Sequence, residues 1–196
     1  MTDWSSEVRH LTQMLVVPLM QTQRHNVVPG IERHESVAEH SFHVACTVSQ
    51  LLRHFPELDG YRALRMALQH DFAESITGDV SVYASARDRS QKASEEAAAL
   101  RTLTDWSITT GVCIAPLAQY VDHDCREAGF VCAVDKIVPY FLVLAGDGHH
   151  ARPSLSQYAE TRKRARGRIT RCFNRLLPIF DEVSELVAAR VESEVR

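Results

Sequence analysis

Apolar residues recur along most of the chain at spacings of three and four, which is the period of an amphipathic helix. The first such stretch places four apolar residues on one helical face: Trp4, Val8, Leu11 and Leu15. Pro18 is expected to end or kink that helix, because proline lacks a backbone donor and clashes with the preceding turn. Similar stretches predict further helices at about 37–54, 60–75, 90–105, 116–121, 127–145, 158–173 and 177–191.

Local signals support several of these boundaries. Ser36 and Glu39 form an S-x-x-E capping box at the start of the helix predicted at 37–54. Gly78 and Gly146 are predicted to stop the helices that precede them, and 21–35 and 80–90 are predicted as loops. No stretch alternates with a period of two over a useful length, so no strand is predicted. The sequence therefore predicts an all-α fold, one helical bundle domain over residues 1–196.

Composition narrows the class of protein. Hydrophobic residues make up 45% of the 196 positions and charged residues 24%, as in soluble globular proteins, and the net charge is -3. Proteins that bind duplex DNA by neutralising phosphates are usually more basic, so the balance argues against nucleic acid as a partner. A basic run over 162–175 is interpreted as a solvated or dimer-facing helix surface.

Cysteine usage and the apolar stretches bear on the compartment. The five cysteines are odd in number and show no C-x-x-C spacing, which argues against a disulfide framework or a zinc knuckle. The stretches Leu15–Met20 and Ile137–Ala145 are far shorter than the roughly 20 apolar residues that span a bilayer. No leader pattern is seen at Met1. We therefore expect a cytoplasmic protein with no membrane partner.

Ionisable residues interrupt three of the apolar helices. A buried imidazole or carboxylate is costly unless it is paired or bound to a metal. His40 lies in the first turn of one predicted helix, His70 and Asp71 lie late in the next, and Asp135 lies inside the apolar 127–145 stretch. Two imidazoles and two carboxylates suit Zn, Mn, Fe or Co and leave positions open for water and substrate. The sequence thus predicts a divalent metal site, against the alternative of satisfied polar residues in the core.

Two further carboxylates lie near this set in the sequence. Glu74 follows His70 by four residues and is therefore expected on the same helical face, next to a metal-activated water. Proton transfer is its natural role. Asp79 follows Gly78 at the expected helix end and is a second candidate, either behind the metal ligands or at a sugar hydroxyl.

Three stretches together resemble the HD-domain phosphohydrolases, and more narrowly the bacterial 5′-deoxynucleotidase branch: Glu35–Ser41, Ala67–Asp79 and Ala133–Lys136. The resemblance extends over about residues 15 to 175. It implies an all-α fold, one or more divalent cations and hydrolysis of deoxynucleotide phosphate esters, in an enzyme that is often a homo-oligomer. By residue, it implies metal ligands at His40, His70, Asp71 and Asp135. It also implies a catalytic acid at Glu74, a second acid of the pocket at Asp79 and a phosphate contact at Arg24.

The chain departs from that pattern where base and phosphate would be recognised. His25 stands where relatives commonly carry tryptophan, which makes it a candidate substrate-binding residue, and Ser81–Ala84 replace a usual proline and lysine. Three functions therefore stay open. The first is a 5′-deoxynucleotidase that releases deoxynucleoside and phosphate. The second is a triphosphohydrolase like the viral HD-type dATPases, and the third is a non-catalytic nucleotide- or RNA-binding scaffold.

Overall fold

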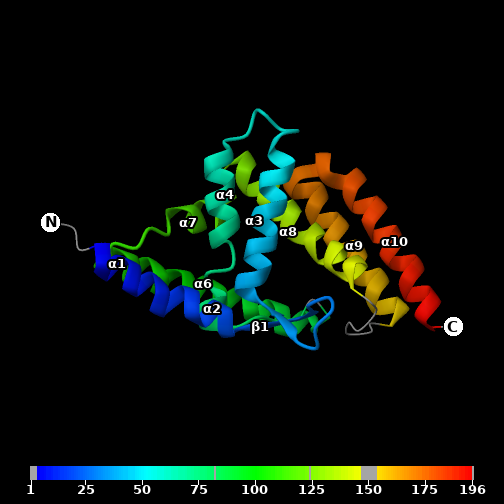
Figure 1. Cartoon of the computed structure of the whole chain (residues 1–196), viewed down its shortest axis with the longest axis horizontal. Coiled ribbons are helices and arrows are strands. Elements are labelled where there is room, and N and C mark those ends of the chain that lie inside the picture. The colour runs from blue at the N-terminus through cyan, green and yellow to red at the C-terminus, as the bar shows by residue number, and fades with distance from the viewer. Residues whose placement is uncertain (1–3, 82, 124, 147–153, 196) are drawn as a thin grey trace.

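In the computed structural model, which describes residues 4–81, 83–123, 125–146 and 154–195, helices account for most of the chain (Figure 1). In chain order the elements are α1 (Trp4–Leu11), the π-helical turn η1 (Thr12–Val16), α2 (Val17–Gln21), β1 (Gln23–Val27), β2 (His34–Ser36), α3 (Val37–Leu52), α4 (Gly60–Gln69), α5 (Glu74–Thr77), α6 (Ala86–Thr110), α7 (Ala115–Val121), α8 (Arg126–Ala145), α9 (Leu155–Phe173), the 3₁₀ turn η2 (Asn174–Leu176) and α10 (Leu177–Val195). The predicted all-α class is confirmed in its main feature.

Helix α8 is the centre of the main hydrophobic core. It packs against α3, α4, α9 and α10, and Figure 1 shows the last two lying alongside it. The ring of Phe130 in α8 packs against the rings of Phe55 and Phe173, tilted and edge-on respectively, at centroid distances of 5.2 and 5.3 Å. By length and composition α8 could also cross a membrane, but 61% of its most apolar stretch is buried inside the fold. The sequence of α8 is therefore explained by its position as a core helix.

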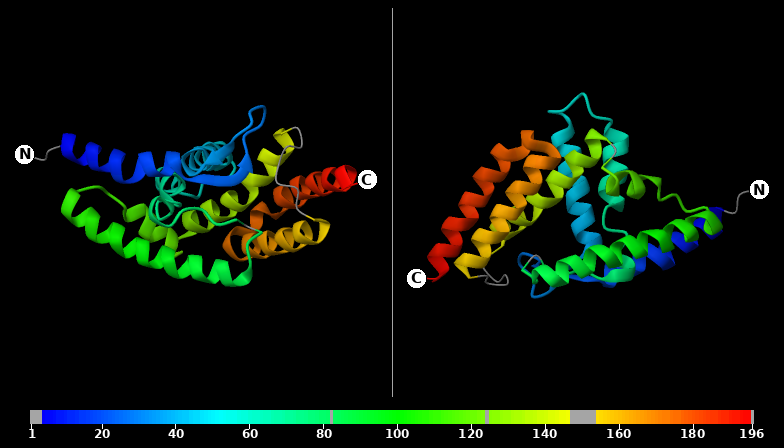
Figure 2. Two further views of the ribbon diagram at one scale, coloured as in Figure 1. Left: turned by 90° about the horizontal axis from the view of Figure 1, so that it is seen from below. Right: turned by 180° about the vertical axis from the view of Figure 1, so that it is seen from behind.

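A second, smaller core joins the N-terminal helices to α6. Leu15, Leu19 and Val37 pack there with Leu103 of α6 and Leu117 of α7. Figure 2 shows α6 running alongside the helices α1 and α2, apart from the pair α9 and α10. This arrangement brings α6 across the short helix α5, with which it is in contact. Residues around 74 and 92 are therefore placed close together although 18 positions separate them.

The N-terminal helix does not end at Pro18, contrary to one of the two outcomes predicted. The turn before it, Thr12–Val16, is π-helical, and helix resumes in α2 until Gln21. A wider turn changes the hydrogen-bond ladder just where proline has no donor to contribute. The helical path therefore continues through the proline.

The prediction of no strand was wrong. Strand β1 pairs antiparallel with β2, with Gln23 opposite Ser36 and Val27 opposite His34, in the stretch predicted as a loop. Gly30 lies in the connection with φ +76°, a backbone conformation that favours glycine. Strands of five and three residues leave little room for a period-two pattern, which explains why no strand was predicted.

Several helix boundaries also differ from prediction, those of α4 and α6 among them. Helix α4 ends at Gln69 rather than near 75, and tight turns follow, in which Phe72 N donates to the Gln69 carbonyl and Glu74 N to the Asp71 carbonyl. Helix α6 begins at Ala86, behind a capping box, and is longer than the predicted 90–105. The capping box at Ser36 and Glu39 is confirmed: the Ser36 hydroxyl accepts from Glu39 N, and the Glu39 carboxylate accepts from Ser36 N.

The basic run on α9 faces acidic residues of α10. Arg166 donates two hydrogen bonds to the Asp181 carboxylate, at 2.8 and 2.9 Å, and Arg162 donates to Ser184 Oγ at 2.9 Å and to Glu185 at 3.3 Å. Two residues of the run, Arg162 and Arg166, therefore have acidic partners on α10, while its interpretation as a solvated or dimer-facing surface stays a prediction.

Candidate active site

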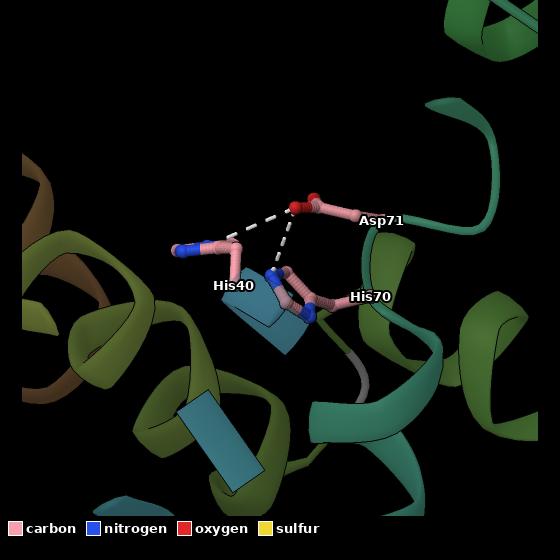
Figure 3. A group of neighbouring side chains, drawn as sticks. All are labelled: His40, His70 and Asp71. Carbon is pink, nitrogen blue, oxygen red and sulfur yellow. Dashed lines mark ion pairs between the residues drawn. The ribbon is translucent and has the colours of Figure 1, made fainter. Parts of the chain in front are cut away.

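Three side chains from two separate parts of the chain point toward one another (Figure 3). His40 comes from the first turn of α3, and His70 and Asp71 come from the turn that follows α4. One ligand-type atom of each lies within 4.8 Å of the other two. Asp71 Oδ2 is 3.2 Å from His70 Nε2 and 3.8 Å from His40 Nε2.

Asp135 completes the predicted set of four. Its Oδ1 atom lies 3.0 Å from His40 Nε2 and 3.8 Å from His70 Nε2, while Lys136 Nζ lies 2.6 Å from its Oδ2. Because α8 packs against both α3 and α4, a carboxylate in the middle of α8 meets the histidines of both segments. The structure therefore brings together all four residues that the sequence predicted as ligands.

The donor set fits a divalent cation. His70 Nδ1 bonds the Ala67 carbonyl at 2.8 Å, which orients the ring and leaves Nε2 facing the two carboxylates. That buried Nε2 atom makes no hydrogen bond of good geometry. Burial lowers the pKa of His70, but the carboxylates of Asp71 and Asp135 outweigh it and raise that pKa to about 10. The Nε2 atom thus lies between two carboxylates, in a setting that would attract a cation.

The other members of the set respond to the same field. Burial and the nearby Arg24 charge lower the pKa of His40 to about 4, so its imidazole is neutral, as a metal ligand must be. The pKa values of Asp71 and Asp135 would be raised by burial alone. For Asp71 the positive charge of His70 outweighs burial, and for Asp135 that of Lys136 does so, and both pKa values are lowered. Both carboxylates are thus anionic at neutral pH.

Arg24 lies at the centre of a ring of carboxylates beside this cluster. Its Nη1 atom donates to Asp71 Oδ2 at 3.3 Å and lies 3.7 Å from both Glu74 Oε2 and Asp79 Oδ1. Its Nε atom is 3.7 Å from Glu35 Oε2. Burial lowers the pKa of Arg24, but the charges of the surrounding carboxylates raise it by more, so the pKa lies above its ordinary value and the guanidinium stays charged. Strand β1 carries Arg24, which explains how a residue upstream of α3 reaches the predicted metal ligands.

Glu74 and Asp79 both lie beside Arg24, and their roles stay predictions. Helix α4 has ended before Glu74, so the helical spacing from His70 does not place it. Glu74 instead opens α5, and Gly78, with φ +72°, closes α5 and returns the chain to Asp79. The pKa of Glu74 is raised to about 8 by burial and then by Asp71, against the opposing charges of Lys92 and Arg24.

Two charged residues of this region were missed from the sequence. Lys92 of α6 lies 2.5 Å from Glu74 Oε1 and 3.8 Å from Asp79 Oδ1. Glu35 is 3% exposed, and burial raises its pKa to about 7 even though Arg24 lowers it. Glu35 belongs to a recognisable motif and could have been found there, whereas Lys92 lies in an Ala- and Glu-rich helix without a motif.

The structure does not bring His25 into the cluster. Along a strand, neighbouring side chains point to opposite faces, so Arg24 and His25 of β1 diverge. Arg24 is turned toward the carboxylates and His25 is exposed. Substrate binding by His25 stays a prediction, and it would require the substrate to extend around the strand.

The chain matches a known protein family and two curated relatives. Residues 18–176 match the HD domain family. The chain is 28% identical to the 5′-deoxynucleotidase hdd1 of Schizosaccharomyces pombe over 113 residues, and 35% identical to the 5′-deoxynucleotidase YGK1 of Saccharomyces cerevisiae over 68 residues. These matches cover 55% and 34% of this chain. They span about half of the first relative (56%) and a third of the second (31%).

Solved structures share the fold. A protein from Magnetospirillum magnetotacticum, described as a predicted metal-dependent phosphohydrolase, superposes with a TM-score of 0.71 at 20% identity, covering 97% of this chain and 95% of its own. A protein from Pyrococcus horikoshii gives a TM-score of 0.58 at 20% identity, covering 91% and 99%. At such identities the likeness concerns the fold. Together with the match over residues 18–176, it shows that the chain belongs to the HD domain family.

Proposed function

We propose that the protein is a 5′-deoxynucleotidase, which hydrolyses the phosphate ester of a deoxynucleoside 5′-monophosphate. The observation that carries the proposal is the convergence of His40, His70, Asp71 and Asp135 next to the buried Arg24. The two fungal relatives named 5′-deoxynucleotidase support the choice of substrate class.

In this proposal the four converging side chains hold one divalent cation. Bound there, such a cation would polarise the phosphoryl group and lower the pKa of a water molecule toward about 7. His40 offers its Nε2 atom, which now bonds Asp135, and His70 offers Nε2, held in orientation by the Ala67 carbonyl. Asp71 and Asp135 each offer the oxygen that faces the imidazoles.

Arg24 would bind the phosphate. A guanidinium presents donors in a planar fork that matches two phosphate oxygens, and Arg24 keeps its charge because acidic groups surround it. Its contacts with Glu74 and Asp79, both 3.7 Å, are longer than hydrogen bonds. A phosphate oxygen can therefore approach Nη1 at the cost of loosening contacts that are already weak.

Glu74 would exchange the proton. Its Oε2 atom lies 3.7 Å from Arg24 Nη1, and the residue is 4% exposed. A carboxyl group whose pKa is raised to about 8 titrates near neutral pH, where a group can both take a proton from water and return one to the leaving 5′ oxygen.

The pairing of charges favours a monophosphate over a triphosphate. Among the described side chains, the cations beside the cluster already have carboxylate partners within 4 Å: Arg24, Lys92 and Lys136. A divalent cation held by the four side chains would supply the two positive charges that balance a phosphomonoester dianion. A triphosphate carries more negative charge, and its outer phosphates would need cations beyond these pairs.

A product assay tests the proposal. The metal-reconstituted protein is incubated with each deoxynucleoside as mono- and triphosphate, and with ribonucleotides, and products are separated by chromatography. Deoxynucleoside plus orthophosphate from monophosphates supports the proposal. Deoxynucleoside plus triphosphate would replace it with the triphosphohydrolase activity, and no product from any of them would reject both. Asp71→Asn should abolish turnover, whereas Asp105→Asn, at an exposed position of α6, should not.

Arg24 gives a separate test of phosphate binding. Arg24→Met removes the guanidinium, and we expect KM for the monophosphate to rise by about tenfold or more, the loss of a charge-assisted pair of hydrogen bonds. Arg9→Met on the exposed face of α1 is the matched control. An unchanged KM in Arg24→Met would show that another residue binds the phosphate.

A further inference from the structure

Helix α6 places the side chain of Lys92 inside the site. Its N-terminus is fixed by a capping box in which Ser85 and Asp88 bond each other's backbone amides, and Lys92 follows one turn later. Lys92 Nζ then reaches Glu74 Oε1 at 2.5 Å and Asp79 Oδ1 at 3.8 Å, with only 17% of its side chain exposed. On the solvent side it lies 3.3 Å from Glu96 Oε1.

The two oxygens of Glu74 are contacted by different cations. Oε1 accepts from Lys92, and Oε2 lies 3.7 Å from Arg24 Nη1. Oε2 is buried and makes no hydrogen bond, so the contact with Lys92 is what fixes the rotation of the carboxylate about its last bond. Without it, Oε1 would be left buried and unpaired, and the carboxylate would turn toward Arg24 or take up a proton.

We propose that Lys92 is a positioning residue for the proposed hydrolysis, which holds Glu74 through Oε1 and leaves Oε2, which makes no hydrogen bond, beside Arg24. The inference rests on the proposed function, because it assumes that Glu74 exchanges the proton. Lys92 acts through Glu74 and not on the substrate, since its ammonium already has three carboxylate neighbours, the closest being Glu74. Asp79, between Arg24 and Lys92, is held by the same pair of cations.

The kinetic test separates positioning from substrate binding. Lys92→Met keeps the aliphatic stem and removes the charge. We expect kcat to fall by about 10- to 100-fold, part of the 10²–10⁴ that general acid–base catalysis contributes, with KM within about threefold. Lys92→Arg should recover most of kcat. Lys163→Met, at an exposed position of α9, is the control and should leave both constants unchanged.

A double-mutant cycle tests whether Lys92 acts through Glu74. In a Glu74→Gln background, Lys92→Met should lower kcat by less than twofold further, because the carboxylate that it positions is gone. Glu96→Gln removes only the outer neighbour of Lys92 and should cost less than threefold. An equal loss from Lys92→Met in both backgrounds, or a rise in KM with kcat unchanged, would overturn the proposal.

An unfolding measurement keeps the inference distinct from the proposed activity. In metal-free protein, Lys92→Met should lower the urea midpoint of the wild type more than that of Glu74→Gln, because only the wild type leaves a buried carboxylate unpaired. Equal shifts would overturn the inference even in an active enzyme. If the wild type hydrolyses none of the nucleotides but the unfolding coupling is present, the proposed function fails while the contact between Lys92 and Glu74 stands.

Discussion

Removal and return of a divalent cation should change the stability of this protein in a way that depends on four residues. The cluster of His40, His70, Asp71 and Asp135 exists only in the folded chain, so a cation that binds there stabilises the folded state by mass action. At a free metal concentration of 100 times Kd the gain is about 2.7 kcal/mol. The reasoning requires that the cation bind the folded state through these side chains.

The size of the chain converts that gain into a temperature. Unfolding entropies near 60 °C are about 2.1 cal/mol/K per residue, which for 196 residues is about 0.4 kcal/mol/K. A gain of about 2.7 kcal/mol therefore raises Tm by about 6 to 7 °C. Asp135→Asn replaces one carboxylate ligand by an amide, and we expect its metal-dependent rise to fall below about 2 °C as the affinity drops.

Scanning calorimetry on chelator-treated protein, titrated with Mn²⁺ and Co²⁺, measures this rise. Asp105→Asn, which removes an exposed carboxylate elsewhere on the surface, should keep the full shift. A wild-type Tm that does not respond to either ion would refute the metal site. So would a shift of the same size in Asp135→Asn, since the ion would then be bound elsewhere.

Two further predictions concern the packing and charge of the helices that carry the site. Gly129→Ala should lower the free energy of unfolding by about 1 to 3 kcal/mol, because its Cβ would lie 2.4 Å from the Cys172 carbonyl oxygen where α8 crosses α9. Gly167→Ala on α9, where the nearest atom is 3.6 Å away, should be neutral or stabilising in the same urea titration. The Arg33 guanidinium lowers the pKa of the half-exposed Glu39 from its ordinary value of 4.5 to about 2. The ion pair therefore stabilises the fold at pH values above 4.5, and this stabilisation is lost as the pH falls toward 2. Glu39→Gln should therefore be less stable than wild type at pH 6, by under about 1 kcal/mol, and equal to it near pH 2, and a difference that persists at pH 2 would contradict this.

The sequence was most informative where function requires a polar group in an apolar setting. Asp135 is conspicuous in α8 because the residues around it, apart from Lys136, are apolar and mostly buried, and the capping box at Ser36 identified the start of the helix that carries His40. The turn after α4 was misjudged, because His70 and Asp71 give no local signal that the helix has ended. Lys92 was not found at all: its contact with Glu74 depends on how α6 lies across α5, which is decided by packing.

The site has one feature that neither local pattern nor family resemblance supplies, namely the alternation of charge through it. Asp71 and Glu74 both lie within 4 Å of Arg24 Nη1, and Glu74 contacts Lys92 through its other oxygen. This alternation of acidic and basic side chains lets each charge be balanced by its neighbours, so that five acidic side chains can lie in one site without all taking up protons. It also means that a phosphate bound to Arg24 weakens the contact that Arg24 makes with Glu74 and leaves Lys92 as the main partner of that carboxylate. Substrate binding would then leave Glu74 held through Oε1 by Lys92, with Oε2 available for proton exchange. Acid–base chemistry at a phosphate ester needs such an arrangement.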